Sequence, residues 1–253
     1  ASNNAFGKSA LDANTTGSSN TAMGHNTLGA NTTAGNNTGF GYQALAVNTT
    51  GAQNTAVGSG ALDANTTAND NTAVGYDALG ANTTGTRNTA LGDSSLQANT
   101  TGSDNTGLGR ETLKANTTGT RNTAVGKNAL NANTTAADNC ALGYEALIAN
   151  TTGAQNVAVG SYALDANTTN SYNTAIGYNA LTANTGEYNT AVGNIALEDN
   201  TTGGANVALG AYAIRNNTTG DHNIGLGNDS LGTNTTGDQN IAIGHQALNA
   251  SNA

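Results

Sequence analysis

Residues 71–87 read NTAVGYDALGANTTGTR, and residues 88–104 repeat the pattern as NTALGDSSLQANTTGSD. This unit of 17 residues recurs along the whole chain, with one copy shortened to 16 where residues 182–188, TANTGEY, lack a threonine. A fixed short period is the signature of a solenoid, in which each repeat forms one coil against its neighbours. The fifteen copies begin at Asn3, Asn20, Asn37, Asn54, Asn71, Asn88, Asn105, Asn122, Asn139, Asn156, Asn173, Asn189, Asn206, Asn223 and Asn240.

The repeat leaves no room for a second domain, so we expect one array over residues 1–253. We number positions within each copy from its opening asparagine, which is position 1. The predicted fold is an all-β β-solenoid of about 15 coils of 17 residues with short parallel strands. Helices are disfavoured because only six residues separate the invariant glycine from the NTT motif, too few for a stable helix.

Three segments of each copy have distinct predicted structures. NTAVG predicts a strand that ends at a glycine corner, xALxA a second short strand, and NTTGxx the closing turn. Position 4 is apolar from Phe6 to Ile243, and position 2 is usually Thr but becomes Cys140 or Val157. Side chains two residues apart share a strand face, so we predict that both columns point inward and that Cys140 is an inert buried thiol. The glycine at position 5 is expected to need a positive φ or a close neighbour.

Position 3 is Ala or Gly in every copy and should lie on the face opposite to positions 2 and 4. Uniformly small residues on an outward face predict that another chain packs closely there. The ends of the array carry no atypical capping coil, which also favours association. The predicted self-association residues are Ala5, Ala22, Gly39, Ala56, Ala73, Ala90, Gly107, Ala124, Ala141, Ala158, Ala175, Ala191, Ala208, Gly225 and Ala242.

Other columns indicate that the coils stack in register. The asparagine of position 12 recurs in nearly every copy and predicts a hydrogen-bonded ladder of side-chain amides. Position 17 predicts a charge ladder, because opposite charges alternate in five successive copies. In the same column Tyr172 and Tyr188 are expected to stack. The charge ladder consists of Asp70, Arg87, Asp104, Arg121 and Asp138.

Units such as NTAVGYDALGANTTG and NTAIGYNALTANTG resemble the head repeats of YadA-like trimeric adhesins. They are still more similar to the 17-residue NTAxGYxALxxNTTG arrays of bacterial surface proteins and phage tail-fibre proteins. The resemblance covers the whole chain. It implies a β-roll, a homotrimer around a common axis, and a role as the shaft or head of an extracellular fibre on a cell surface or virion.

The composition excludes several classes of binding partner. The net charge is −9, and the seven Lys and Arg residues are scattered, which argues against nucleic acid. No apolar run is long enough for a membrane span. The three histidines form no ligand column, so we expect no enzyme, no metal and no cofactor. The chain itself is the expected partner, as a homotrimer or a filament, and a host-surface receptor or glycan is a further candidate. The surface of the chain that would contact a receptor or glycan is the outward tyrosine column of Tyr42, Tyr76, Tyr144 and Tyr178.

Two other functions fit the repeats. An ice-binding solenoid would use regular threonine rows, although we expect the position 2 threonines to be buried and positions 13 and 14 to face opposite ways. An end-to-end polymerising surface filament or coat subunit is the other alternative. Its NTT motifs are N-glycosylation sequons in thirteen copies, but an asparagine held in an inward ladder could not carry a glycan.

Overall fold

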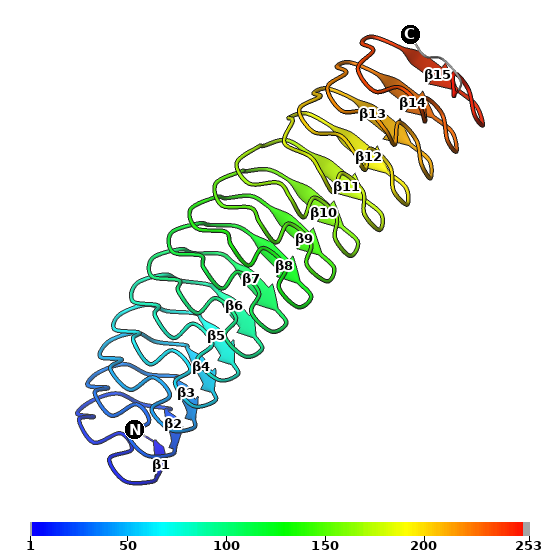
Figure 1. Ribbon diagram of the computed structural model, residues 1–253. Coiled ribbons are helices and arrows are strands. Elements are labelled where there is room, and N and C mark those ends of the chain that lie inside the picture. The colour runs from blue at the N-terminus through cyan, green and yellow to red at the C-terminus, as the bar shows by residue number, and fades with distance from the viewer. Residues whose placement is uncertain (1, 250–253) are drawn as a thin grey trace. The chain divides into compact units, whose positions relative to one another are not determined.

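In the computed structural model, which describes residues 2–249, the chain is an all-β parallel solenoid of about fifteen coils. The predicted fold class is therefore confirmed. The chain divides into two compact units, Ala1–Lys127 and Asn128–Ala253, and both are built from the same coil. Each coil contributes one strand of three residues, at positions 2 to 4 of the repeat (Figure 1).

The strands of each unit pair in sequence order. In the first unit they are β1(Asn4–Phe6), β2(Thr21–Met23), β3(Thr38–Phe40), β4(Thr55–Val57), β5(Thr72–Val74), β6(Thr89–Leu91), β7(Thr106–Leu108) and β8(Thr123–Val125). In the second they are β9(Cys140–Leu142), β10(Val157–Val159), β11(Thr174–Ile176), β12(Thr190–Val192), β13(Val207–Leu209), β14(Ile224–Leu226) and β15(Ile241–Ile243).

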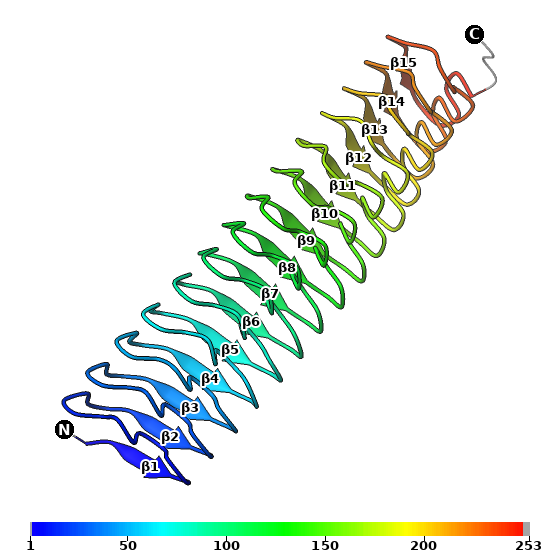
Figure 2. The same cartoon turned by 60° about the vertical axis from the view of Figure 1, so that its left-hand side comes forward.

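Pairing within each unit is parallel and in register, so that equivalent positions of successive coils are neighbours. Ala56 of β4, for example, lies beside Ala73 of β5, and Ala158 of β10 lies beside Ala175 of β11. Figure 2 shows the strands of each unit side by side along one face of the coils. Each column of the sequence alignment is therefore also a column of side chains in space.

The glycine at position 5 turns the chain out of the strand, as predicted. Gly75 has φ +140, and a Cβ atom built on it would lie 2.4 Å from the carbonyl oxygen of Gly92 in the next coil. Both reasons expected for this glycine are therefore confirmed. A φ near +140 is strained for any residue with a side chain, and the neighbouring backbone leaves no space for a Cβ atom.

The segment predicted as a second strand, xALxA, forms turns instead. Its leucine at position 9 has a positive φ in copy after copy, as at Leu62 with φ 52, and so does position 7, as at Asp77 with φ 53. A left-handed leucine costs roughly 1–2 kcal/mol. Complete burial of the Leu62 side chain offsets this cost. The prediction was wrong because the positive φ at positions 7 and 9 turns the segment, whereas a strand needs an extended backbone throughout.

The core of each coil is narrow and contains few side chains. Leu62 and the alanines Ala56 and Ala61 are 0% exposed, and so are the asparagines Asn54 and Asn65. The predicted orientation of the strand is therefore wrong: position 3 points inward, and positions 2 and 4 point outward. An interior shared with leucine and two asparagines holds alanine at position 3 but has no space for valine or phenylalanine.

Position 3 is small because it belongs to the core. It is glycine where a larger side chain occupies the neighbouring interior. A Cβ atom on Gly39 would lie 2.5 Å from Thr27 Cγ2, and one on Gly107 would lie 2.6 Å from Ser95 Oγ. Most other copies have alanine where Thr27 and Ser95 stand, at position 8. This exchange of volume between positions 3 and 8 is typical of a close-packed interior.

Two ladders of buried asparagines join successive coils. At position 12 the Asn65 Nδ2 group donates to Asn48 Oδ1 of the preceding coil at 2.8 Å and to the Ala68 carbonyl at 3.1 Å. At position 1 the Asn54 backbone N–H donates to Asn37 Oδ1 at 2.9 Å, while Asn54 Nδ2 donates to the same Ala68 carbonyl at 2.8 Å. The predicted ladder is confirmed at position 12, and the ladder at position 1 was not anticipated.

The corner glycine gives a first prediction. Gly75→Ala should lower the free energy of unfolding by about 3 kcal/mol or more, because φ and the Gly92 backbone both exclude a side chain. Gly60→Ala is the matched control: its φ is +70, and the nearest atom to a new Cβ lies 3.6 Å away, so about 1 kcal/mol is expected. Urea unfolding followed by circular dichroism measures both, and equal losses would contradict the role of the close neighbour.

The asparagine ladder gives a second prediction. Asn82→Ala removes donations to Asn65 Oδ1 and the Gly85 carbonyl, and it leaves Asn99 Nδ2 with the Gly102 carbonyl but without its acceptor in the preceding coil. We expect a loss of about 3 kcal/mol, because buried polar groups are left unsatisfied. Thr84→Ala alters the same NTT motif at an exposed side chain and should change stability by less than about 0.5 kcal/mol. Urea unfolding compares the two variants, and similar unfolding midpoints would contradict a stabilising role of the ladder.

Candidate interaction surface

The outward face of the strands carries two columns of side chains, at positions 2 and 4, which we call the outer strand columns. Their positions follow from the inward alanine, because neighbours in a strand project to opposite faces. Position 4 is apolar in every copy and is Phe, Met, Val, Leu or Ile. The strands therefore present aliphatic and aromatic side chains to the outside, at the place where a half-buried strand usually carries polar ones.

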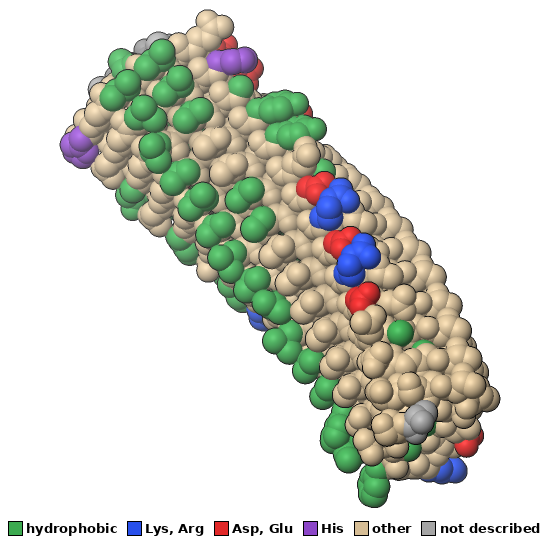
Figure 3. Space-filling model, turned by 180° about the vertical axis from the view of Figure 1, so that it is seen from behind, with side chains coloured by type: hydrophobic (Ala, Val, Ile, Leu, Met, Phe, Trp, Pro, Cys, Tyr) green, Lys and Arg blue, Asp and Glu red, His purple; other side chains and the backbone are tan. Residues whose placement is uncertain are grey.

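These side chains are substantially exposed in the single chain. In the first unit Phe40 is 47% exposed and Leu91 48%, and in the second Leu142 is 47% and Leu209 50%. Figure 3 shows hydrophobic side chains gathered in a band on the surface. Singly exposed apolar residues are common, but contiguous rows of them mark contact surfaces. The outer strand columns are therefore the strongest candidate for an interaction surface.

The small-residue column of position 3, predicted as the self-association face, does not form a surface. Ala22, Ala73, Ala141 and Ala208 are at most 1% exposed, and the exposure of Ala5 is confined to the first coil. A second chain cannot touch side chains that their own coil covers. The prediction that these residues lie on an outward face was therefore wrong. Their uniform small size results from crowding inside the coil.

Cys140 also lies differently from its prediction. It occupies position 2 at the start of β9, on the outward face, and it is partly exposed. Position 2 threonines are likewise accessible: Thr55 is half-buried and Thr72 is exposed. Substitution of Thr by Cys, Val or Ile in this column therefore increases the apolar character of the outer face and adds nothing to the core.

The charge ladder at position 17 is confirmed for Arg87 and Asp104, which form an ion pair. Arg87 Nε donates to Asp104 Oδ1 at 2.6 Å and Arg87 Nη2 to Oδ2 at 3.0 Å, a bidentate pair between adjacent coils. The pKa of Asp104 is lowered by the hydrogen bond from Arg87 and by the charges of Arg87 and Arg121. Asp70 lies within electrostatic range of Arg87. Asp138 belongs to the second unit. Solvent-exposed pairs of this kind fix register and add little stability.

The tyrosines predicted to point outward do so, with exposed fractions of 54% for Tyr42, 62% for Tyr76, 39% for Tyr144 and 49% for Tyr178. In the second unit they form a cluster through Tyr162, whose ring is 5.4 Å from Tyr144 and 6.1 Å from Tyr178, edge to face in both pairs. Tyr162 stands one position later in the repeat, and the column reading missed it for that reason.

The NTT motifs contribute threonine rows on another part of the coil surface. At position 13 threonine hydroxyls donate to the threonine carbonyl of the next coil, as from Thr49 to Thr66 at 3.0 Å and from Thr83 to Thr100 at 3.0 Å. At position 14 the side chains, such as Thr84, are exposed. The two positions were predicted to face opposite ways, but the coil leaves both at least partly accessible in its last turn.

Other kinds of site find less support. Within residues 2–249 no group of three or more His, Cys, Asp and Glu side chains could hold a metal ion. In the same residues no helix is long and apolar enough to span a membrane. Neither the protein-family models nor the curated protein sequences compared with this chain gave a match.

The buried sequons give a third prediction. The acceptor Asn48 is 0% exposed, and its amide is engaged by neighbouring coils. Glycosylation of an NTT motif would require the coil to open. We therefore expect the folded chain, treated with a purified oligosaccharyltransferase and a lipid-linked glycan donor, to keep its unmodified intact mass, whereas the urea-unfolded chain gains glycans after dilution. Modification of the folded chain at several sites would contradict the buried ladder.

Proposed function

We propose that the chain is a structural, non-enzymatic β-solenoid that forms the shaft or head of an extracellular fibre, of the surface-adhesin or phage tail-fibre type. It assembles with copies of itself through the outer strand columns. The observation that carries the proposal is the unbroken apolar column at position 4, which has side chains such as Leu91 and Leu142 nearly half exposed. The resemblance of the repeats to YadA-like head repeats supports the same conclusion.

A second copy of the chain suits this surface better than an unrelated partner. The apolar side chains recur once per coil, so a partner must present contacts with the same spacing to cover them all. Another solenoid of the same repeat has that spacing by construction, and symmetric association of identical chains is the usual form of protein assembly. Burial of the position 4 side chains would supply the apolar centre that stable interfaces have.

Three chains around one axis are the arrangement that the resemblance implies. The tyrosines of position 6, such as Tyr76 at 62% exposure, lie outside the strand and remain the candidate surface for a receptor or a glycan. Tyrosine supplies a large contact area at small entropic cost. The extracellular location, on a cell surface or a virion, belongs to the same proposal.

Ice binding is the second candidate, and the orientation of the strands favours it more than the sequence did. The position 2 threonines of the first unit, from Thr21 to Thr123, lie on the outward face in a regular row. The neighbouring column mixes Phe40, Val57 and Leu91, and such uneven side chains suit a deformable protein interface better than a flat lattice. Thermal hysteresis without self-association would support this alternative.

Multi-angle light scattering tests the proposal, and it gives a fourth prediction. A trimer should have three times the chain mass of 24.9 kDa, about 75 kDa. The double variant Leu91→Lys/Leu142→Lys should have the mass of the single chain, because paired interfaces do not tolerate buried unpaired lysines. Both leucines are about half exposed in the single chain, so the coil itself should fold.

The control is Thr84→Lys/Thr152→Lys, which adds the same charge at exposed positions of the NTT motifs. It should keep the mass of the unmodified protein. A monomeric unmodified chain would refute the proposed assembly. A double leucine variant that keeps the full mass would show that the copies meet elsewhere.

A further inference from the structure

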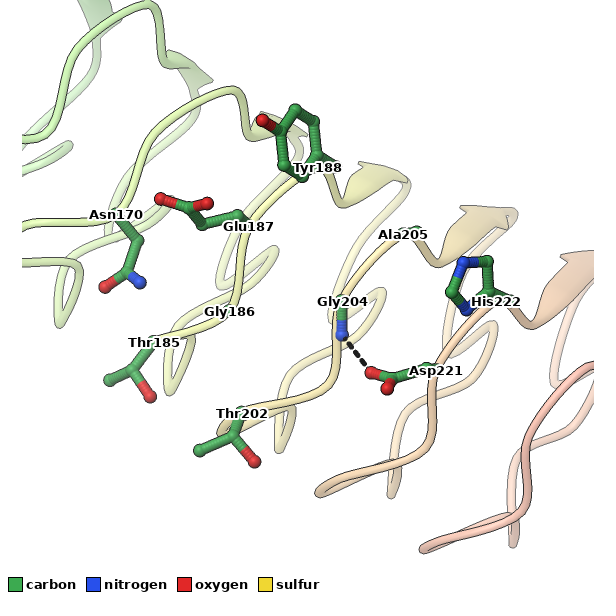
Figure 4. A pocket seen from close by; sticks show the side chains of 10 residues that line it. All are labelled: Asn170, Thr185, Gly186, Glu187, Tyr188, Thr202, Gly204, Ala205, Asp221 and His222. Carbon is green, nitrogen blue, oxygen red and sulfur yellow. Dashed lines mark hydrogen bonds between the residues drawn. The ribbon is translucent and has the colours of Figure 1, made fainter.

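A shallow depression of about 480 Å³ lies in the second unit, between β11 and β14 (Figure 4). Its lining comes from four successive copies, one of which is the only copy of 16 residues. The residue types shared by all copies do not produce such a depression, so it depends on the residues of these particular copies. The residues that line it are Asn170, Thr185, Gly186, Glu187, Tyr188, Thr202, Gly204, Ala205, Asp221 and His222.

The depression results from two small residues between larger ones. The last two residues of three successive copies are Glu187–Tyr188, Gly204–Ala205 and Asp221–His222. The Ala205 N–H donates to the Glu187 carbonyl and the His222 N–H to the Gly204 carbonyl, each at 3.0 Å, so the three coils are directly joined here. The absence of side chains beyond Cβ in the middle coil leaves a gap between its neighbours.

The gap interrupts a column of stacked rings. Tyr172 and Tyr188 have ring centroids 5.0 Å apart and planes 3° from parallel, which confirms the stacking expected from the sequence. Ala205 and His222 have nearly the same backbone as these tyrosines, with φ of 53 and 59 against 64 and 61. All four side chains therefore leave the coil in a similar direction, and Ala205 stands where the column lacks a ring.

The dimensions of the gap suit one planar group. Two strand spacings of about 4.8 Å separate the coils of Tyr188 and His222. One ring placed over Ala205 would continue the stack at the interval seen between Tyr172 and Tyr188. The exposed fraction of Tyr188, 59%, exceeds the 49% of Tyr172, as expected if one of its faces is covered by Tyr172 and the other is open to the gap.

The charge around the gap is negative. Asp221 points toward Gly204 and accepts a hydrogen bond from its N–H at 2.7 Å through Oδ1, while Glu187 points toward Asn170 at the rim (Figure 4). The ten lining residues include these two carboxylates and no Lys or Arg. A group that enters the gap therefore has the Tyr188 and His222 side chains on its two sides and the Asp221 carboxylate near it.

We propose that this slot binds the guanidinium group of an arginine side chain presented by a partner peptide or protein. A guanidinium is planar, stacks on aromatic faces and pairs with carboxylates through a fixed fork of N–H donors. It would lie over Ala205 between the Tyr188 and His222 rings and donate to the Asp221 carboxylate. An ammonium group lacks the planar shape, and a neutral planar group lacks the charge.

The experiment is an NMR titration of the full chain with N-acetyl-L-arginine amide, observed at the aromatic C–H signals of Tyr188 and His222. N-acetyl-L-lysine amide carries the same charge without the planar group, and N-acetyl-L-citrulline amide has the planar group without the charge. We expect saturable shifts with the arginine probe and an affinity about tenfold higher than with either of the others. Equal affinity for the lysine probe would overturn the proposal, because it would reduce the site to general charge attraction.

Two variants locate the binding. Ala205→Tyr should fill the gap and abolish the shift of His222, and the fold should tolerate it because Tyr172 and Tyr188 occupy the same repeat position. The matched control Gln53→Tyr places the same residue at position 17 of the first unit, and it should leave the titration unchanged. Binding that survives in Ala205→Tyr, or an unmodified chain that gives no saturable shift, would refute the slot.

Discussion

The structure depends on the buried amide ladders inside each unit. The position 12 ladder is interrupted in the second unit at the shortened copy, where Asn184 Nδ2 donates to the Gly186 carbonyl and Asn167 Oδ1 is buried without a hydrogen-bond partner. Each coil has too few apolar side chains to be stable alone, so the bonds to its neighbours determine whether it folds at all. The Ala68 carbonyl accepts from both Asn54 and Asn65, and the two asparagines are wholly buried. An unsatisfied amide in this environment would be costly. The ladders therefore hold successive coils in register and leave a one-residue slip strongly unfavourable.

The ladders also determine what the surface looks like. Two asparagines, two alanines and one leucine fill the interior of a coil, and the corner glycine brings the next backbone within contact distance. No large strand residue fits inside, so Val, Leu, Phe and Ile of position 4 lie outside. The narrow core thus creates the apolar outer columns. The proposed assembly into a fibre follows from the same packing that makes each coil possible.

Much of this could be predicted from the sequence, because a strict repeat turns columns of letters into columns of atoms. The solenoid, the ladder at position 12, the corner glycine and the Arg87–Asp104 pair all followed from period and residue type. The orientation of the strand did not, because Thr-Ala-Val alternation fits either face. One signal was available: Gly39 and Gly107 each follow a copy with an enlarged residue at position 8, Thr27 and Ser95, and an inward position 3 explains this exchange of volume.

The left-handed leucines could not be read from residue type, since leucine has no preference for that conformation. The slot at Ala205 was missed for a different reason. It arises because one copy departs from its neighbours at this position, and the features shared by all copies do not predict such a departure. Both errors have the same origin. Averaging over copies reveals the shared coil and conceals the places where single copies depart from it.

Cys140 offers the most direct measurement of the central claim, that copies meet through the outer strand columns. It is the chain's single cysteine and lies on that face at the start of β9. A short bis-maleimide added to the assembled protein should join two chains rapidly through their Cys140 side chains. The yield of cross-linked chains should not change when the protein is diluted to concentrations at which it is still assembled. If light scattering shows that the protein is assembled but the bis-maleimide gives only chains that are not cross-linked, the copies meet through another surface.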